Sequence, residues 1–224
     1  MSIAIVGGTG DQGFGLALRL GGAGRSIVIG SRDAERGSAA AAKAVERLGG
    51  KADVTGAANA DAVAAAEVVF VTVPFAGQAD IYRSIAEAVP EGVVVCDCTS
   101  PLATATGGRP WQVLRPWQGS AVEQAKEILP KGTRLVSGFH TIAAEALEDL
   151  DHPLDGDVLL CGADAEAKAT IGELAASIPN LGWADAGALT AARILEPMTA
   201  ILVNLNRRYK VRTAGFRVTG LPER

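Results

Sequence analysis

Short runs of valine, isoleucine and other apolar residues recur along the chain, and alanine-rich stretches with apolar positions three and four residues apart lie between them. Uninterrupted apolar runs are typical of strands that helices cover on both faces of a sheet. The pattern predicts strands at residues 3–7, 26–30, 51–54, 67–73, 92–97, 133–137, 157–161 and 181–184. It predicts helices at residues 12–22, 33–48, 78–88, 120–129, 164–177 and 188–207. This alternation predicts an α/β fold with a doubly wound, mainly parallel sheet.

The last predicted helix carries one wide apolar stripe, formed by Ile194, Leu195, Met198, Ile201, Leu202 and Leu205. Such a stripe either packs on the sheet of its own chain or forms the interface of a homodimer, and the sequence leaves both possibilities open. No linker rich in proline or serine divides the chain. We therefore expect one main domain at residues 1–187, followed by a C-terminal helix and tail at residues 188–224.

Glycine is unusually frequent, with 27 of 224 residues against a usual share of about 7%. The order Gly8-x-Gly10-x-x-Gly13 stands between the first predicted strand and the first predicted helix. It is the fingerprint of a Rossmann-type dinucleotide-binding unit. One glycine permits a tight turn, the next lets the backbone approach a pyrophosphate, the third lets helix pack on strand, and the helix N-terminus attracts the anion. We expect a Rossmann-type domain that binds a dinucleotide.

The end of the second predicted strand indicates which dinucleotide is bound. Proteins that bind NAD place an acidic residue there, on the ribose 2′-hydroxyl, whereas this chain has Ser31 and Arg32, with Arg36 one helical turn further on. A hydroxyl and two guanidinium groups can bind a 2′-phosphate, which a carboxylate would repel. Asp33 is either that acidic residue or, as we favour, a helix N-cap. The sequence predicts NADP(H) rather than NAD(H).

The formal net charge of −4 conceals an uneven distribution. Six of the 21 basic residues, but only one of the 25 acidic residues, lie between positions 207 and 224. A basic tail indicates an acidic ligand, a nucleic acid or a membrane surface, or it is simply a solvated terminus. The acidic body of the chain argues against a nucleic-acid partner.

Composition excludes several further classes. Apolar residues make up 48% of the chain and charged residues 21%, which excludes a disordered protein. A membrane span needs about 18 consecutive uncharged apolar residues, and no segment approaches that length. The first residues lack the basic region of a signal peptide. Cys96, Cys98 and Cys161 form no C-x-x-C pair, and the two histidines cannot form H-E-x-x-H. We therefore expect a cytoplasmic location, no membrane contact and no metal site.

The reacting groups should lie at the carboxyl ends of the strands, where ligands of open α/β sheets bind. Segments 72–75, 97–102 and 138–141 follow three predicted strands, and together they predict a cleft. Carbonyl reduction needs a proton donor, yet the chain has no Tyr-x-x-x-Lys pair, no Gly-x-Ser-x-Gly elbow and no P-loop. His140 is the obvious acid near this cleft, and it is either a catalyst or a hydrogen-bonded structural residue.

Five motifs carry a family resemblance. They are the glycine-rich run 7–13 followed by Gly15-Leu16-Ala17-Leu18-Arg19-Leu20, then Ile29-Gly30-Ser31-Arg32, Gly138-Phe139-His140-Thr141, Asp185-Ala186-Gly187 and Asn204-Leu205-Asn206-Arg207-Arg208-Tyr209-Lys210. Together they resemble the NADPH-dependent coenzyme F420 reductases, also called F420H2:NADP+ oxidoreductases. The resemblance runs from the first strand to the last dozen residues.

The resemblance implies hydride transfer between C4 of the nicotinamide and C5 of the deazaflavin. It implies no catalytic acid or base, because the deazaflavin ring is itself the electron acceptor. The cofactor-binding residues that it implies are Gly8, Thr9, Gly10, Asp11, Gln12 and Gly13 at the pyrophosphate, Ser31, Arg32 and Arg36 at the 2′-phosphate, and Val73 and Pro74 at the nicotinamide ribose. The deazaflavin pocket would be formed by Ser100, Pro101, Leu102, His140, Thr141, Ala144 and Ala214.

The resemblance also supplies a partner for the tail, since F420 carries a phosphodiester and glutamates that the basic segment 207–217 could bind. Trp111 and Trp117 either line the acceptor pocket or pin a loop. Two other functions stay open: an NADPH-dependent reductase of another flat acceptor or an imine, and a non-catalytic module that senses NADP. We expect small-molecule coenzymes as partners, no nucleic acid, no membrane, and a homodimer.

Overall fold

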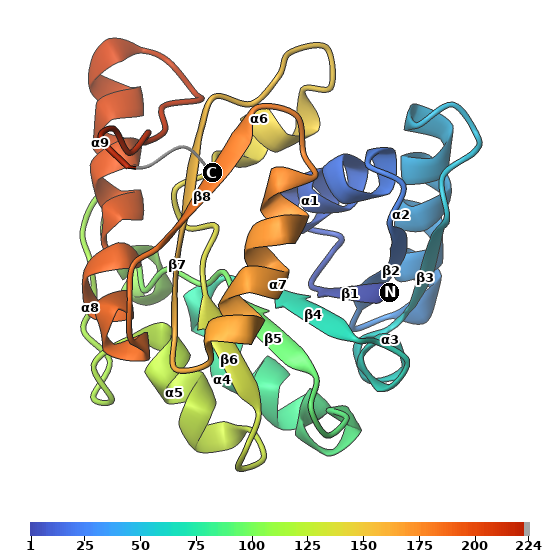
Figure 1. The fold of residues 1–224 in the computed structure, drawn as a ribbon. Helices are drawn as coiled ribbons and strands as arrows, with labels where there is room; N and C mark the ends of the chain where they lie inside the picture. Colours follow the sequence, from blue (N-terminus) through green and yellow to red (C-terminus); the bar gives the residue numbers. More distant parts are fainter. Residues whose placement is uncertain (222–224) are drawn as a thin grey trace.

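An eight-stranded sheet runs through the centre of the molecule, in the order β3-β2-β1-β4-β5-β6-β7-β8 (Figure 1). The computed structural model describes residues 1–221, so Glu223 and Arg224 of the predicted tail lie outside the described residues. The strands are β1 (Ser2–Val6), β2 (Ser26–Ser31), β3 (Val54–Ala58), β4 (Val68–Val71), β5 (Val94–Asp97), β6 (Arg134–Ser137), β7 (Gly156–Gly162) and β8 (Leu181–Asp185). Neighbouring strands are parallel except β6 and β7, which confirms the predicted doubly wound, mainly parallel sheet.

The strand order reverses between β1 and β4. The chain builds outward from β1 to β3 and then returns to the other side of β1 to add β4, β5 and β6. Ligands of open α/β sheets bind in the crevice at such a switch point, outside the carboxyl ends of the strands. The fold therefore places the expected crevice between the segments that follow β1 and β4.

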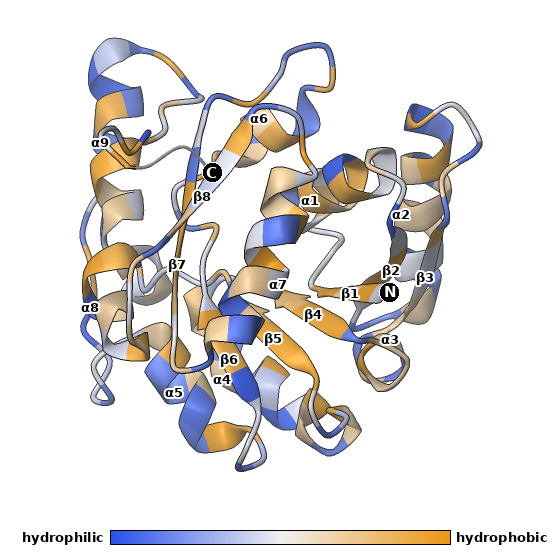
Figure 2. Cartoon of the chain, in the orientation of Figure 1, coloured by the Kyte–Doolittle hydropathy of each residue, from blue (hydrophilic) through white to orange (hydrophobic). Residues whose placement is uncertain are grey.

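Helices cover both faces of the sheet (Figure 1). They are α1 (Asp11–Gly22), α2 (Ala34–Arg47), α3 (Asn59–Ala64), α4 (Phe75–Ile85), α5 (Ala121–Ile128), α6 (Ala144–Glu148), α7 (Ala165–Ala176), α8 (Ala192–Leu195) and α9 (Met198–Tyr209). Successive strand residues alternate between two apolar cores, so that Ile3 and Ile5 share a core with residues of α1, whereas Ala4 and Val6 share the other core with residues of α3, α4 and α5. Figure 2 shows the central strands as predominantly hydrophobic, as burial on both faces requires.

Two predictions about local structure were wrong, and two short helices were missed. The strand predicted at 51–54 is β3, at Val54–Ala58, because its place is fixed by a close backbone approach: a Cβ on Gly56 would lie 2.2 Å from the carbonyl carbon of Gly37. The helix predicted at 188–207 begins with a 3-10 turn (Leu189–Ala191) and then breaks between α8 and α9 at Pro197, since proline disrupts a helix interior. The short helices α3 and α6 were not predicted.

The C-terminal part lies along one side of the molecule, where α8 and α9 follow each other (left in Figure 1). After α9 the chain returns over the start of β7, where Asp157 N donates to Phe216 O at 2.8 Å. In residues 1–221, the helices are all too short or too polar to cross a membrane. The division into residues 1–187 and 188–224 stays a prediction.

Candidate functional site

The glycine-rich loop after β1 makes a tight turn that leads into the N-terminus of α1. Gly7 has a φ of +74°, and Gly8 N donates to Ile5 O at 3.1 Å and to Gly30 O at 3.0 Å. A Cβ on Gly13 would lie 2.4 Å from Thr72 Oγ1 and 2.7 Å from Gly8 Cα. Gly10 is the N-cap of α1, and no side chain caps the helix. The first amides of α1 are therefore left for an anion.

A cleft of about 570 Å³ opens beside this loop. It is lined by Gly7, Thr9, Gly10, Ser31, Arg32, Arg36, Asn59, Thr72, Val73, Pro74, Ala76, Gly77, Asp80, Ile81 and Ser84. The structure thus brings together the predicted 2′-phosphate residues, the predicted ribose residues and part of the phosphate loop. Of the other predicted cofactor residues, Gly8 and Gly13 are buried behind the loop, while Asp11 and Gln12 face neighbouring pockets.

The cationic end of the cleft is formed by Ser31 at the end of β2 and by Arg32 and Arg36, whose side chains are exposed. Asp33 is the N-cap of α2, as predicted, because its Oδ1 accepts from Glu35 N at 2.8 Å and from Arg36 N at 3.3 Å. Its carboxylate is therefore engaged with the helix, and the positive charge of the two arginines dominates this end.

Asn59 lines the cleft and was missed by sequence reasoning. It begins α3 directly after β3, is buried, and its Oδ1 accepts from Gly7 N at 3.4 Å. Since β3 was predicted several residues too early, the residue that follows its carboxyl end was misplaced as well. The α4 residues Asp80 and Ser84 were missed because only helix geometry turns them toward the cleft.

A second pocket, of about 200 Å³, lies on the other side of the start of α1. It is lined by Gln12, His140, Thr141, Ile142, Ala143, Ala144, Glu145, Thr199, Leu202, Val203, Asn206 and Ala214. Four of the predicted acceptor residues are therefore together here: His140, Thr141, Ala144 and Ala214. Gln12 Nε2 donates to Phe139 O at 3.0 Å, which ties the phosphate loop to this pocket.

The remaining predicted acceptor residues lie next to this pocket without lining it. Ser100 Oγ is 2.6 Å from Thr199 Oγ1, which donates to His140 O at 2.8 Å. Because the Thr199 proton goes to this carbonyl, Ser100 is the donor in the first of these hydrogen bonds. Pro101 and Leu102 pair with the returning loop, through Leu114 N to Pro101 O at 2.7 Å and a bridge from Leu102 to Val113.

The two tryptophans of this loop have different surroundings. The Arg207 guanidinium of α9 lies 4.2 Å from the centre of the Trp111 ring, and that of Arg109 lies 5.4 Å away, so Trp111 pins the loop to α9 by cation–π contact. Trp117 is 99% exposed. Neither residue lines the two pockets described above.

His140 is buried, and its Nε2 lies 3.3 Å from Ser137 Oγ. Burial lowers the pKa of the imidazole to about 3, because the low-dielectric surroundings disfavour the charged form. The ring is therefore neutral at neutral pH and carries no proton to deliver as an imidazolium. This geometry favours the hydrogen-bonded structural role over acid catalysis.

A buried hydrogen-bond network lies at the end of β5 and reaches a residue that lines the cleft. Asp97 accepts from Tyr82 Oη at 2.6 Å, from Gln78 Nε2 at 2.7 Å and from Thr99 N at 2.7 Å, and Thr99 Oγ1 donates to Val73 O at 3.3 Å. Burial raises the pKa of Asp97 and, well above its usual range, that of Tyr82. The network links the loop after β5 to the predicted ribose residue Val73. Within residues 1–221, no cluster of three or more potential metal ligands is found.

Comparison with known proteins agrees with this geometry. The family described as "NADP oxidoreductase coenzyme F420-dependent" matches residues 2–101. The F420-dependent NADP reductase of Methanothermobacter thermautotrophicus is 43% identical, over 100% of this chain and 97% of the relative. That of Methanocaldococcus jannaschii is 42% identical, over 99% of both chains.

A solved structure from Arthrobacter sp. FB24, described as an F420-dependent NADP reductase, superposes with a TM-score of 0.82 and 26% identity, over 98% of this chain and 100% of that one. The similarity thus includes the C-terminal extension as well as the nucleotide-binding half. Because the identity to the curated reductases extends over the entire chain, this protein belongs to the family of coenzyme F420-dependent NADP reductases.

Proposed function

We propose that this chain transfers a hydride between NADP(H) and coenzyme F420. The observation that carries the proposal is the pair of neighbouring pockets on either side of the start of α1, one reaching from the phosphate loop to Arg32 and Arg36, the other lined by His140 and α9. One short segment, Thr9 to Gln12, contributes to both. Two ligands bound in these pockets would meet near it.

The residues present fit NADP(H). The phosphate loop leaves no room for a side chain at Gly13 and leaves the α1 amides uncapped, so a pyrophosphate can approach the backbone. Ser31, Arg32 and Arg36 would hold the 2′-phosphate by charge-assisted hydrogen bonds. Val73 and Pro74, which follow β4, would contact the nicotinamide ribose.

The second pocket suits a flat acceptor such as the deazaflavin ring. His140, Thr141, Ala144 and Ala214 would surround the ring, and Ser100 would act through Thr199. When both are bound, the nicotinamide would supply a hydride from C4 and the deazaflavin would accept it at C5; the negative charge would be delocalised in the conjugated ring, which would take up its proton from solvent, so the protein would need no catalytic acid. The protein contributes binding, mutual orientation and exclusion of water. A neutral His140 agrees with a protein that binds and orients the two ligands without donating a proton.

The experiment that tests this function mixes the protein with NADPH and oxidised F420 and follows the loss of the oxidised deazaflavin absorbance. Turnover supports the proposal. Turnover of another flat acceptor or an imine without F420 would favour a different reductase. Tight NADPH binding with no acceptor reduced would favour an NADP-sensing module.

We extend the proposal to the basic tail, where part of the charge is engaged within the protein. Arg207 stacks on Trp111, Arg212 pairs with Glu145 at 3.1 Å, and Arg217 pairs with Asp155. These contacts fasten the tail to the body. We propose that Arg208 and Lys210, at the exposed end of α9, attract the phosphodiester and glutamates of F420.

Replacing Arg208 and Lys210 by glutamine is expected to raise the Michaelis constant for F420 about three- to tenfold at low ionic strength, because exposed charges contribute modestly and are screened by salt. Steady-state kinetics at two salt concentrations measure the effect, which should shrink at high salt. The control is Lys126→Gln with Lys131→Gln, which removes the same charge from exposed positions at the far end of α5. Equal changes in both double variants would contradict the tail's role.

We also propose that the chain forms a homodimer through the outer face of α8 and α9. The predicted apolar stripe is divided: Leu195 and Leu202 are buried, whereas Ile194 and Ile201, seven residues apart, are 72% and 53% exposed. Ile194 is on α8 and Ile201 is on α9, and the two helices follow each other along the same side of the molecule (Figure 1). Large apolar side chains exposed in this way are typical of an interaction surface, and a second copy presents the same face.

Ile194→Glu with Ile201→Glu is expected to convert the dimer to a monomer, because burying carboxylates in an apolar interface is unfavourable. Size-exclusion chromatography with light scattering gives the mass. Ala39→Glu, on the exposed face of α2, should leave the mass unchanged. A monomeric wild-type protein would refute the proposed interface.

The proposed location is the cytoplasm. Cys96, Cys98 and Cys161 are buried free thiols, and a chain whose cysteines stay reduced is typical of a reducing compartment.

A further inference from the structure

Arg19, in the middle of α1, has surroundings that the proposed function does not explain. Its side chain is 7% exposed, and its guanidinium donates to four backbone carbonyl oxygens. Nε donates to Leu147 O at 2.9 Å, and Nη2 donates to Ala146 O at 2.7 Å, to His152 O at 2.9 Å and to Asp149 O. Burial lowers the pKa of the guanidinium. A buried cation that is surrounded by main-chain oxygens organises the backbone around it.

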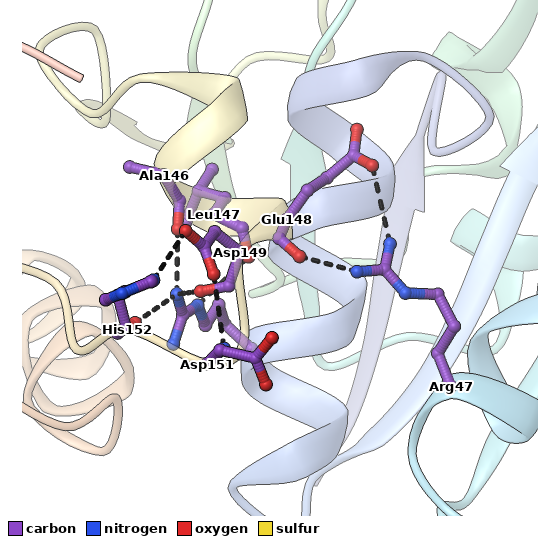
Figure 3. Close-up of polar contacts among 8 residues, drawn as sticks. Arg47, Ala146, Leu147, Glu148, Asp149, Asp151 and His152 are labelled. Carbon is purple, nitrogen blue, oxygen red and sulfur yellow. Dashed lines mark hydrogen bonds and ion pairs between the residues drawn. The ribbon is translucent and has the colours of Figure 1, made fainter. Parts of the chain in front are cut away.

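The four carbonyls belong to the end of α6 and to the turn that follows it (Figure 3). At five residues, α6 is far too short to be stable alone, and its last carbonyls have no partner within the helix. Arg19 supplies that partner from another element, and its charge also suits a helix C-terminus. The turn is closed by Asp149, whose Oδ2 lies 2.8 Å from His152 Nδ1 and whose Oδ1 accepts from Asp151 N at 3.2 Å.

The segment held by Arg19 forms one wall of the second pocket. Thr141, Ala144 and Glu145 line that pocket just before the carbonyls bound by Arg19. Any movement of α6 would therefore change the width of the pocket.

One face of α1 holds this wall at three points. Gln12 donates to Phe139 O, Gly15 allows a close approach because a Cβ there would lie 2.6 Å from Leu147 Cβ, and Arg19 binds the turn. Positions 12, 15 and 19 share one side of a helix. The same helix begins at the phosphate loop, so α1 connects the two pockets as a rigid element.

We propose that Arg19 is a positioning residue, which sets the distance between the second pocket and the phosphate loop by holding α6 and the turn 149–152 against α1. The proposal rests on the proposed function for the identity of the two ligands. Hydride transfer depends steeply on that distance, because reacting atoms must lie within about 3–3.5 Å of one another.

The test compares Arg19→Lys and Arg19→Met with the control Arg47→Met. Lysine keeps the charge, but its ammonium group lacks the planar donor fork of the guanidinium and cannot reproduce the four contacts. Arg47 reaches the same segment from α2, where Nη2 donates to Glu148 O at 2.6 Å and Nη1 lies 3.4 Å from Glu148 Oε2. It does so at the surface, without reaching the turn at Asp149 and His152 (Figure 3).

For Arg19→Lys, we expect an unchanged Kd for NADPH, a Michaelis constant for F420 raised about tenfold and a kcat lowered about tenfold, in keeping with the effect of small displacements on transfer rates. Arg47→Met should change all three by less than twofold. Equal losses in NADPH affinity and F420 kinetics, or unchanged kinetics for both Arg19 variants, would overturn the proposal.

Amide hydrogen exchange gives a readout that does not depend on activity. The amides of Leu147 and Asp149, which donate to Ala143 O and Glu145 O at 3.1 Å, should exchange faster in Arg19→Lys while the amides of β1 and β4 keep their protection. Unchanged exchange in residues 146–152 would refute the positioning role even if wild-type protein proved inactive with F420. An inactive wild type with the expected exchange difference would instead refute the proposed function and leave the role of Arg19 standing.

Discussion

Replacing Arg32 and Arg36 together by alanine is expected to weaken NADPH binding by about 10²–10⁴-fold and to leave NADH binding nearly unchanged. Each arginine would contribute a charge-assisted hydrogen bond to the 2′-phosphate, and removing such a bond typically costs about 1.5–3 kcal/mol. NADH lacks that phosphate, so it has nothing to lose at these positions. The two side chains line the cleft at its cationic end.

Fluorescence titrations with NADPH and NADH give the four dissociation constants. The matched control is Lys43→Ala with Arg47→Ala, which removes two exposed cations from the same helix but outside the cleft. If the control lost as much affinity, general attraction to the anionic ligand would explain the effect. Equal losses for NADPH and NADH would place the arginines on another part of the dinucleotide, and equal affinities of the wild type would refute the preference for NADP(H).

Local sequence patterns were enough to predict the central strands and the glycine-rich turn after β1. The central strands are buried on both faces, so their sequences are apolar runs such as Val68–Val71, and the turn after β1 needs glycines at fixed offsets. The edge strand β3 has only Val54 as a large apolar residue. Its register depends on the contact of Gly37 with Gly56, which lies in the tertiary structure and leaves no periodic pattern.

The break in the last helix was different, because the sequence contained the signal. Pro197 stands inside the predicted helix, and a proline there interrupts the hydrogen bonds of the preceding turn. The apolar spacing continues across it, since Leu195 and Leu202 both face the body of the protein. Periodicity reports which side chains are buried, and it is insensitive to such an interruption of the backbone.

In the candidate site, too, some residues could be predicted from local sequence and others could not. Residues at strand ends, such as Ser31 and Val73, were predictable because a parallel sheet gathers its carboxyl ends at one edge. The contacts of Arg19 were not predictable, because its partners are backbone carbonyls some 130 positions away, and any residue type supplies a carbonyl. Main-chain recognition of this kind leaves no mark on the residues that are recognised.

The second large effect that we expect is a pH dependence of the free energy of unfolding, and it comes from Glu196. This residue lies at the junction of α8 and α9, is fully buried, and caps α5: Oε2 accepts from Ala121 N at 2.7 Å and Oε1 from Val122 N at 3.0 Å. Burial, and then the charge of Asp97, raise the pKa of this carboxyl to about 8. The folded protein therefore holds a proton that the unfolded chain, with a glutamate pKa of about 4.3, releases.

The sign of the pH dependence follows from that difference. The contribution of Glu196 to stability is fully present below the unfolded pKa and is lost as pH rises through about 8. Between pH 5.5 and pH 8.5 we expect the free energy of unfolding of the wild type to fall by about 2–4 kcal/mol relative to Glu196→Gln, which stays neutral. His140, whose folded pKa is lowered to about 3, opposes this trend, but its contribution is common to both proteins and cancels.

Urea unfolding at the two pH values measures this difference, and Glu123→Gln is the matched control. Glu123 lies beside Glu196 at the start of α5, but its pKa is lowered, chiefly by its hydrogen bonds with Arg193 at 2.9 and 2.8 Å. It is therefore ionised in both states at both pH values, and its replacement should lower stability equally at each. If the free energy of unfolding changed with pH by the same amount in the wild type and in Glu196→Gln, the two α5 amides would be holding Glu196 as a carboxylate in the folded protein. The C-terminal extension would then be anchored to α5 by a buried charge instead of a buried acid.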